Sequence, residues 1–210
     1  MKYGLALHTS SPALGLAISS SADDVRCQTW DLGRETSNYL HGHLLDFLRP
    51  QTWQDLGWLA VASGPGGFTG TRLAIVTART LGQQLNLPVF TISSLAAIVW
   101  QSQPVGTVAI SMSAQRGEVF GAVYHLSLDR QELTPILPDT VFLAADWDRQ
   151  LAHFQPSHHH TIPQSANLAA TVVGVLALAR MAAARGKCPD WSLAVPFYGQ
   201  HPVVAGSVAK

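Results

Sequence analysis

Residues 64–71, Gly-Pro-Gly-Gly-Phe-Thr-Gly-Thr, have the composition of a backbone turn that could bind an anion. An apolar run at residues 58–62 precedes them and a helical pattern at residues 72–85 follows, so the sequence predicts a glycine-rich connection between a strand and a helix. The first N–H groups of a helix lack intrahelical partners, and the helix dipole adds partial positive charge beside them. The alternative is a tight polar connection with a Thr N-cap and no ligand. The candidate nucleotide or anion loop comprises Gly64, Gly66, Gly67, Thr69 and Gly70, and we expect Gly66 and Gly67 to adopt conformations that bulky residues cannot.

Histidines are the other residues here that could do chemistry, by binding a metal. Two imidazoles on a helix reach one metal when they are three or four residues apart. His41 and His43 are two residues apart and therefore lie on different helix faces. The run His158-His159-His160 could bind a metal from solution, but residues 135–162 contain several prolines and are expected to form an exposed, loop-rich segment. We predict no metal site.

The elements that must position these residues alternate between strands and helices, which is typical of a mixed sheet covered by helices. The second half repeats the opening hairpin of the first half, so we predict two α/β units, residues 1–102 and 103–210. Strands are expected at residues 3–11, 14–20, 25–30, 58–62, 89–91, 105–112, 118–125 and 132–137. Helices are expected at residues 37–48, 72–85, from 94 onward, and 166–185.

Composition excludes several classes of protein. The chain has 210 residues, of which 47% are hydrophobic, enough for a substantial core. The longest apolar stretch, residues 168–179, is shorter than the roughly 20 residues of a membrane helix, and the N-terminus does not resemble a signal peptide, so we expect a cytoplasmic protein. Cys27 and Cys188 form no Cys-x-x-Cys pair. Thirteen basic residues balance thirteen acidic ones without a basic cluster, which predicts weak binding of nucleic acid by the chain alone.

The helix expected at residues 72–85 has two apolar faces. Ala74, Ala78, Leu81 and Leu85 form one stripe, suited to packing on a sheet. Val76 lies nearly opposite that stripe, and an apolar outward face suggests a surface for a partner. The alternative is that another part of the chain, such as the helix at residues 37–48, covers this face.

Several of these segments together resemble one family, the TsaB (YeaZ) proteins. The family's Ile-Asp-Thr-Ser start, Gly-Pro-Gly-Ser-Phe-Thr-Gly-Val-Arg turn and Ser-Ser-Leu segment correspond to residues 7–10, 64–72 and 93–95. Residues 116–120, Arg-Gly-Glu-Val-Phe, and residues 195–198, Val-Pro-Phe-Tyr, resemble two further family segments. The resemblance implies a duplicated actin-like (ribonuclease H-like, ASKHA) fold with two α/β subdomains and mixed sheets.

The resemblance also implies partners. TsaB proteins are non-catalytic partners of TsaD, which transfers threonylcarbamoyl to the adenosine beside the anticodon of tRNA, and the ATPase TsaE docks on the pair. The implied cofactor is at most a weakly bound ATP or ADP where subunits meet, and the chain would contact tRNA only indirectly. Homodimerisation is a second implied mode of association. The implied partner interface comprises Leu73, Val76 and Thr80, with Leu40 and Leu44 from the preceding helix.

Two departures from the family pattern bear on catalysis. His8 replaces the aspartate on the first strand, and Ser113-Ala114-Gln115 replaces Asp-Ala-Arg in the second half. Actin-like ATPases position magnesium with carboxylates at such strand ends, so we predict no catalytic residue, and a structural role for Glu118. The alternatives left open are an active ATPase or kinase of the same fold and a metallopeptidase-like protein.

Overall fold

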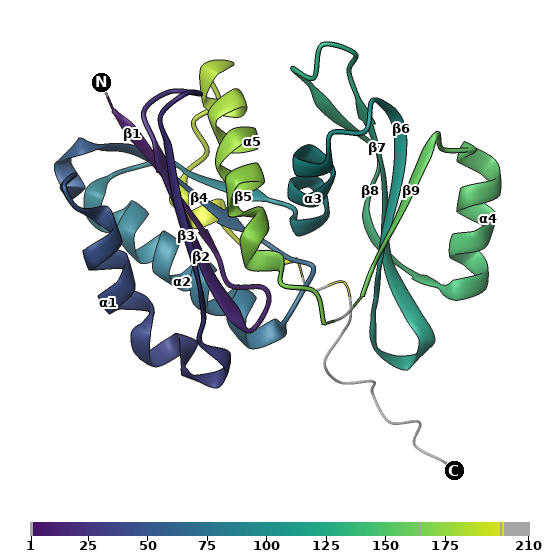
Figure 1. Cartoon of the computed structure of the whole chain (residues 1–210), viewed down its shortest axis with the longest axis horizontal. Helices are drawn as coiled ribbons and strands as arrows, with labels where there is room; N and C mark the ends of the chain where they lie inside the picture. Colours follow the sequence, from purple (N-terminus) through teal and green to yellow (C-terminus); the bar gives the residue numbers. More distant parts are fainter. Residues whose placement is uncertain (1, 164, 198, 200–210) are drawn as a thin grey trace.

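The computed structural model describes residues 2–163, 165–197 and 199, and Figure 1 shows them arranged around two sheets. The first sheet has the strand order β3-β2-β1-β4-β5. Strand β1 is antiparallel to β2 and parallel to β4. The opening strands therefore form the predicted hairpin, β3 extends it by pairing antiparallel with β2, and β4 and β5 join in parallel through helical crossovers. The five strands are β1 (Tyr3–His8), β2 (Ala13–Ser19), β3 (Val25–Asp31), β4 (Leu56–Ala62) and β5 (Val89–Ile92).

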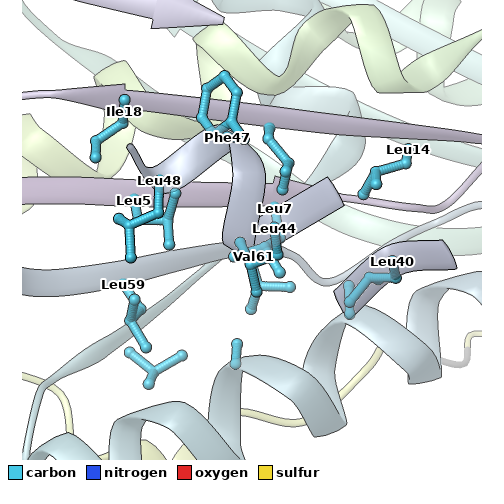
Figure 2. Packing of buried hydrophobic residues seen from close by; sticks show 14 of the residues in the cluster. Leu5, Leu7, Leu14, Ile18, Leu40, Leu44, Phe47, Leu48, Leu59 and Val61 are labelled. Atoms are coloured by element: carbon cyan, nitrogen blue, oxygen red, sulfur yellow. The ribbon is translucent and has the colours of Figure 1, made fainter. Parts of the chain in front are cut away.

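Two helices, α1 (Thr36–Leu48) and α2 (Phe68–Leu85), cover one face of this sheet. Figure 2 shows the core beneath α1, where Leu40, Leu44 and Phe47 meet strand residues such as Leu5 and Leu7. The predicted inner stripe of α2 is confirmed, because Ala74 and Ala78 are fully buried and Leu81 and Leu85 pack against the same core. These helices form because their apolar residues repeat every three to four positions.

The second sheet has the order β8-β7-β6-β9. Its strands are β6 (Gly106–Ser113), β7 (Glu118–Leu126), β8 (Leu133–Leu143) and β9 (His158–Ile162). Helix α4 (Ala144–Phe154) packs on its outer face through Trp147. The expectation of a loop-rich segment at residues 135–162 is therefore wrong. This segment instead forms β8, α4 and β9, and the two strands pair with the rest of the second sheet. The prolines and the histidine run in the segment suggested a loop because the pairing depends on strands distant in sequence.

The histidine run forms β9, an edge strand paired in parallel with β6. The His159 ring lies near the Trp147 ring at a tilt of 56°, with ring centroids 6.2 Å apart. Alternation along a strand turns His159 to one face and His158 and His160 to the other. Within the described residues, no group of three or more His, Cys, Asp or Glu side chains could hold a metal ion.

Helix α3 (Ser94–Ser102) and helix α5 (Val172–Ala184) lie between the two sheets (Figure 1). Helix α5 follows the second sheet in the chain, but its residues Val175, Leu176 and Ala179 pack with Ala60 and Phe90 of the first sheet. Helix α3 contributes Leu95 and Val99 to the core of the second sheet. The two sheets therefore share this middle layer. Among the residues that the structure describes, no helix has the length and apolarity to cross a membrane.

Candidate functional site

A cleft of about 890 Å³ lies between the two halves of the molecule. One wall comprises the β1–β2 turn, the segment before α1 and the first turn of α2. The other wall is the β6–β7 turn, with Met112 and Phe120 beside it. The cleft therefore combines the glycine-rich turn with the second-half hairpin that the sequence singled out.

Helix α2 begins at Phe68, four residues before the predicted start, with Gly67 as its N-cap. Thr69 and Gly70 thus belong to the first helical turn and face the cleft. Gly64 and Gly66 precede the helix, and only Gly66 of these two lines the cleft. The structure brings most of the predicted loop residues together, as the first turn of a helix preceded by a short loop.

The glycines of this turn allow close packing against the β1–β2 turn. A Cβ atom on Gly66 would overlap the Ser10 carbonyl group, and a Cβ on Gly70 would overlap the Thr9 carbonyl oxygen. The Gly67 N–H donates to the Ser10 carbonyl oxygen at 2.6 Å, and the Thr9 hydroxyl donates to the Gly70 carbonyl oxygen at 2.6 Å. The chain's own residues therefore occupy much of the space that an anion would take against these glycines.

The expectation that Gly67 excludes bulky residues by its backbone conformation is wrong. Its φ is −61°, and an added Cβ would lie 3.4 Å from the Ser10 carbonyl oxygen, an ordinary contact. Positive φ occurs instead at Gly64, where φ is 98°, and at Gly66, where φ is 159°. Sequence alone could not distinguish these positions, because the restriction at Gly66 and Gly70 comes from residues about sixty positions earlier in the chain.

His8 lies at the end of β1 and is completely buried. Its Nδ1 accepts the Ser10 N–H at 3.3 Å, which implies that the proton of the neutral ring is on Nε2. The Nε2 atom has no hydrogen-bond partner among the described residues. Burial lowers the pKa of His8 to about 3, so the ring is neutral at physiological pH. A neutral, enclosed imidazole cannot replace a carboxylate as a magnesium ligand facing the cleft.

The buried His8 predicts a specific acid sensitivity. Its pKa in the folded chain, about 3, lies below the unfolded value of 6.5, so the unfolded chain binds an additional proton between these pH values. The contribution of neutral His8 to the free energy of unfolding should therefore be fully present well above pH 6.5. Below that pH the free energy of unfolding should fall by up to about 1.4 kcal/mol per pH unit. Urea denaturation at pH 7, 6 and 5 measures this slope. The His8→Gln variant should show a shallower slope, and equal slopes would contradict the assignment.

The charged side chains lining the cleft are basic. Arg34 and Arg116 line it, and none of the described lining residues is Asp or Glu. Ser113, Ala114 and Gln115 occupy the second-half turn as the sequence indicated, whereas Glu118 begins β7 and is not among the lining residues. Arg116 lies in a family segment noted above, but neither Arg116 nor Arg34 was predicted to line a site, because neither forms part of a recognisable basic cluster. The arrangement can attract an anion, but it supplies no carboxylate for a metal ion or for a general base.

A second feature is a groove of about 510 Å³ along the exposed face of α2. Val76 is 61% exposed, and Val76 and Thr80 both line the groove with Trp191 and Pro196 from the C-terminal segment. Of the other predicted interface residues, Leu73 is half-buried, and Leu40 and Leu44 lie within the core beneath α1. Val76 and Thr80 therefore lie together on the exposed face of α2, whereas Leu40 and Leu44 are buried and cannot form part of an interface. The exposed apolar residues of α1 are Tyr39 and Leu45, which sequence periodicity alone did not identify.

The two helix-covered sheets with a cleft between their opening hairpins define an actin-like α/β protein. A sequence model of the TsaD family, described as tRNA N6-adenosine threonylcarbamoyltransferase, matches residues 50–179. This match covers more than half of the 210 residues, and the chain therefore belongs to the TsaD family.

Individual relatives confirm the resemblance to TsaB and YeaZ. The TsaB protein of Bacillus subtilis is 33% identical over 95 residues, covering 45% of this chain and 41% of that protein. The TsaB protein of Buchnera aphidicola is 33% identical over 76 residues, covering 35% of this chain and 36% of that protein. The chain thus matches less than half the length of these curated relatives. The solved structure of YeaZ from Pseudomonas aeruginosa shares the fold, with a TM-score of 0.71, 23% identity, and coverage of 94% of this chain and 100% of that one.

The C-terminal family segment can be placed only in part. Phe197 lines the cleft, and its backbone N–H donates to the Ser63 carbonyl oxygen at 2.7 Å. Tyr198, the last residue of that segment, lies outside the described residues. The structure therefore connects this segment to the end of β4 without testing the role of the tyrosine.

Proposed function

We propose that this chain is a non-catalytic, actin-like subunit of the machinery that makes threonylcarbamoyladenosine in tRNA. Its relatives in Bacillus subtilis, Buchnera aphidicola and Escherichia coli are named as TsaB proteins of that biosynthesis, which supports the pathway. In this proposal the chain binds and positions TsaD, and TsaD transfers the threonylcarbamoyl group to the adenosine beside the anticodon. The chain itself contributes a surface and contacts tRNA only through its partner.

The observation that carries the non-catalytic role is the chemistry of the cleft. Phosphoryl transfer in an actin-like cleft needs carboxylates that hold magnesium and orient the attacking group. In this chain a buried neutral His8 stands at the end of β1, and the turn after β6 offers Ser113 and Gln115. The described cleft residues bear hydroxyl and guanidinium groups instead of carboxylates.

We therefore expect the purified chain to hydrolyse ATP no faster than a buffer blank when magnesium is present. Phosphate release measured over hours would detect slow turnover, and a His8→Ala variant would show whether any activity belongs to this site. Magnesium-dependent turnover that disappeared in His8→Ala would favour the alternative, an active ATPase or kinase of the same fold.

The proposed docking surface is the exposed face of α2. Apolar Val76 and polar Thr80 lie next to each other on this face, one helical turn apart. The groove around them is also lined by Arg72, Gln83, Trp191 and Pro196. A groove next to an exposed valine suits a helix from another protein. The proposal assigns this face to TsaD. Docking of TsaE on the resulting pair, a loosely held ATP or ADP between subunits, and self-association in the absence of TsaD are further parts of the proposal.

The proposal is tested with TsaD from the same organism. Co-elution of the two purified proteins measures pairing, and formation of threonylcarbamoyladenosine in tRNA, with and without this chain, measures function. We expect a stoichiometric pair and a strong dependence of modification on the chain. Full modification by TsaD and the other components without this chain would contradict the proposal.

A further inference from the structure

Asp139, whose carboxyl group is half-buried, contacts residues from both halves of the molecule and is not one of the residues that line the cleft. Asp139 of β8 accepts a hydrogen bond from the Tyr124 hydroxyl of β7, with an O–O distance of 2.6 Å. The Ser93 hydroxyl also hydrogen-bonds the Asp139 carboxylate, and its Oγ lies 3.3 Å from the Tyr124 oxygen. Ser93 belongs to the first half of the chain, whereas Tyr124 and Asp139 belong to the second sheet.

The backbone of β8 is irregular where it carries Asp139. Gly121 of β7 pairs with Thr140, but Val123, two residues later, pairs with Leu137, three residues earlier in β8. The extra residue forms a bulge that includes Pro138 and Asp139, and bulges of this kind redirect a side chain. The bulge therefore explains how an aspartate in an edge strand comes to hydrogen-bond Tyr124, which is only 4% exposed.

The first-half end of this cluster is tied to the glycine turn. Ser93 is the N-cap of α3, and its Oγ accepts the Ala96 N–H at 3.1 Å. The next residue, Ser94, donates its N–H to the Gly64 carbonyl oxygen at 2.7 Å. A short chain of hydrogen bonds thus runs from the β8 bulge through the start of α3 to the residue that begins the glycine turn.

The burial of Asp139 and Tyr124 makes their hydrogen bonds important for stability. Burial is the main cause that raises the pKa of both Asp139 and Tyr124, and no Lys or Arg contributes to either shift. The hydroxyl groups of Tyr124 and Ser93 are therefore the side-chain donors that satisfy the carboxylate. A poorly solvated carboxylate that loses a donor is strongly disfavoured, so the cluster favours the arrangement in which donors from both halves are present.

We propose that Ser93, Tyr124 and Asp139 form a latch that holds the second sheet in a fixed position relative to the glycine turn and so sets the width of the cleft. Asp139 acts in this latch as a positioning residue, and contributes no chemistry of its own. The inference rests on the contacts of this chain and is independent of the proposed partner.

The latch is tested by measuring the distance between the halves. Spin labels on Cys27, exposed on β3, and on a cysteine introduced by Arg149→Cys, exposed on α4, report the separation of the two sheets in a Cys188→Ser background. We expect Asp139→Ala and Tyr124→Phe to broaden the distance distribution and to speed amide exchange at Ser94 by about tenfold. Asp139→Asn, which can still accept from Tyr124 and donate to Ser93, should retain the narrow distribution.

Tyr39→Phe is the matched control, because Tyr39 is exposed on α1, which packs on the first sheet, whereas Tyr124 and Asp139 belong to the second sheet. It should leave both measurements unchanged. If folded Asp139→Ala and Tyr124→Phe proteins keep the wild-type distance distribution, the latch is overturned. A lower melting temperature with an unchanged distribution also overturns it, because the cluster would then stabilise β8 locally without positioning the sheets.

Discussion

Replacing Gly70 with alanine is expected to destabilise the chain by about 3 kcal/mol or more, the upper range for overpacking a buried contact. The added methyl group would overlap the Thr9 carbonyl oxygen, which is backbone and cannot rotate away. The Gly70 carbonyl oxygen also accepts the Thr9 hydroxyl, so separating the two segments would break that bond. Thermal unfolding should show a melting temperature lower by about 6–12 °C for a chain of this size.

Two glycine variants serve as controls for this prediction. Gly67→Ala places its methyl group at ordinary contact distance from Ser10, and should cost less than about 1 kcal/mol, mainly through the poorer N-cap. Gly42→Ala, in open space on α1, should instead stabilise the chain by about 0.5–1 kcal/mol. Equal losses at Gly70 and Gly67 would show that close packing against the β1–β2 turn is not what requires glycine.

Val76→Glu is expected to abolish or strongly weaken pairing with TsaD while the chain itself folds normally. Val76 is 61% exposed in the free chain, so the new carboxylate would be hydrated before association. Burying it without a partner charge should weaken binding by at least about 2 kcal/mol, which is about thirtyfold in Kd. Calorimetry or co-elution with TsaD from the same organism measures the loss, and the tRNA modification should fall with it.

Leu128→Glu is the matched control for this surface. Leu128 is 88% exposed in the β7–β8 turn, on the second half of the molecule, so the same change of an apolar side chain to a carboxylate occurs away from α2. It should leave pairing unchanged. Wild-type pairing by a folded Val76→Glu protein would mean that the exposed face of α2 does not bind TsaD.

Local patterns in the sequence predicted most of the elements that form the first sheet. Alternating and continuous apolar runs identified the strands from β1 to β5, and the stripe of Ala74, Ala78, Leu81 and Leu85 predicted the buried face of α2. The repetition of a hairpin followed by further strands and helices predicted two α/β units, and the family resemblance implied that they form an actin-like fold. These successes have a common reason, since periodicity of side chains against one flat sheet is a local property of the chain.

Prediction failed where partners distant in sequence determine the structure. Residues 135–162 contain an extended β8, α4 and β9, which become recognisable only when β9 pairs with β6 and Trp147 enters the outer core. Leu40 and Leu44 were predicted at an interface, but the tight packing of α1 against the first sheet buries them completely or almost so. Helix α5 was visible as an apolar helix, whereas its return to the first sheet was not.

The candidate site shows the same division. The sequence by itself determined that a glycine-rich turn precedes α2, that His8 on the first strand replaces an aspartate of the family pattern, and that Ser113-Ala114-Gln115 replaces Asp-Ala-Arg in the second half. Only the tertiary structure decided that Thr9 and Ser10 pack into the glycine turn, that His8 is enclosed and neutral, and that Arg34 and Arg116 line the cleft. Residue types and short spacings follow from the covalent chain, but burial, pKa and close approach depend on which distant segments the fold brings together.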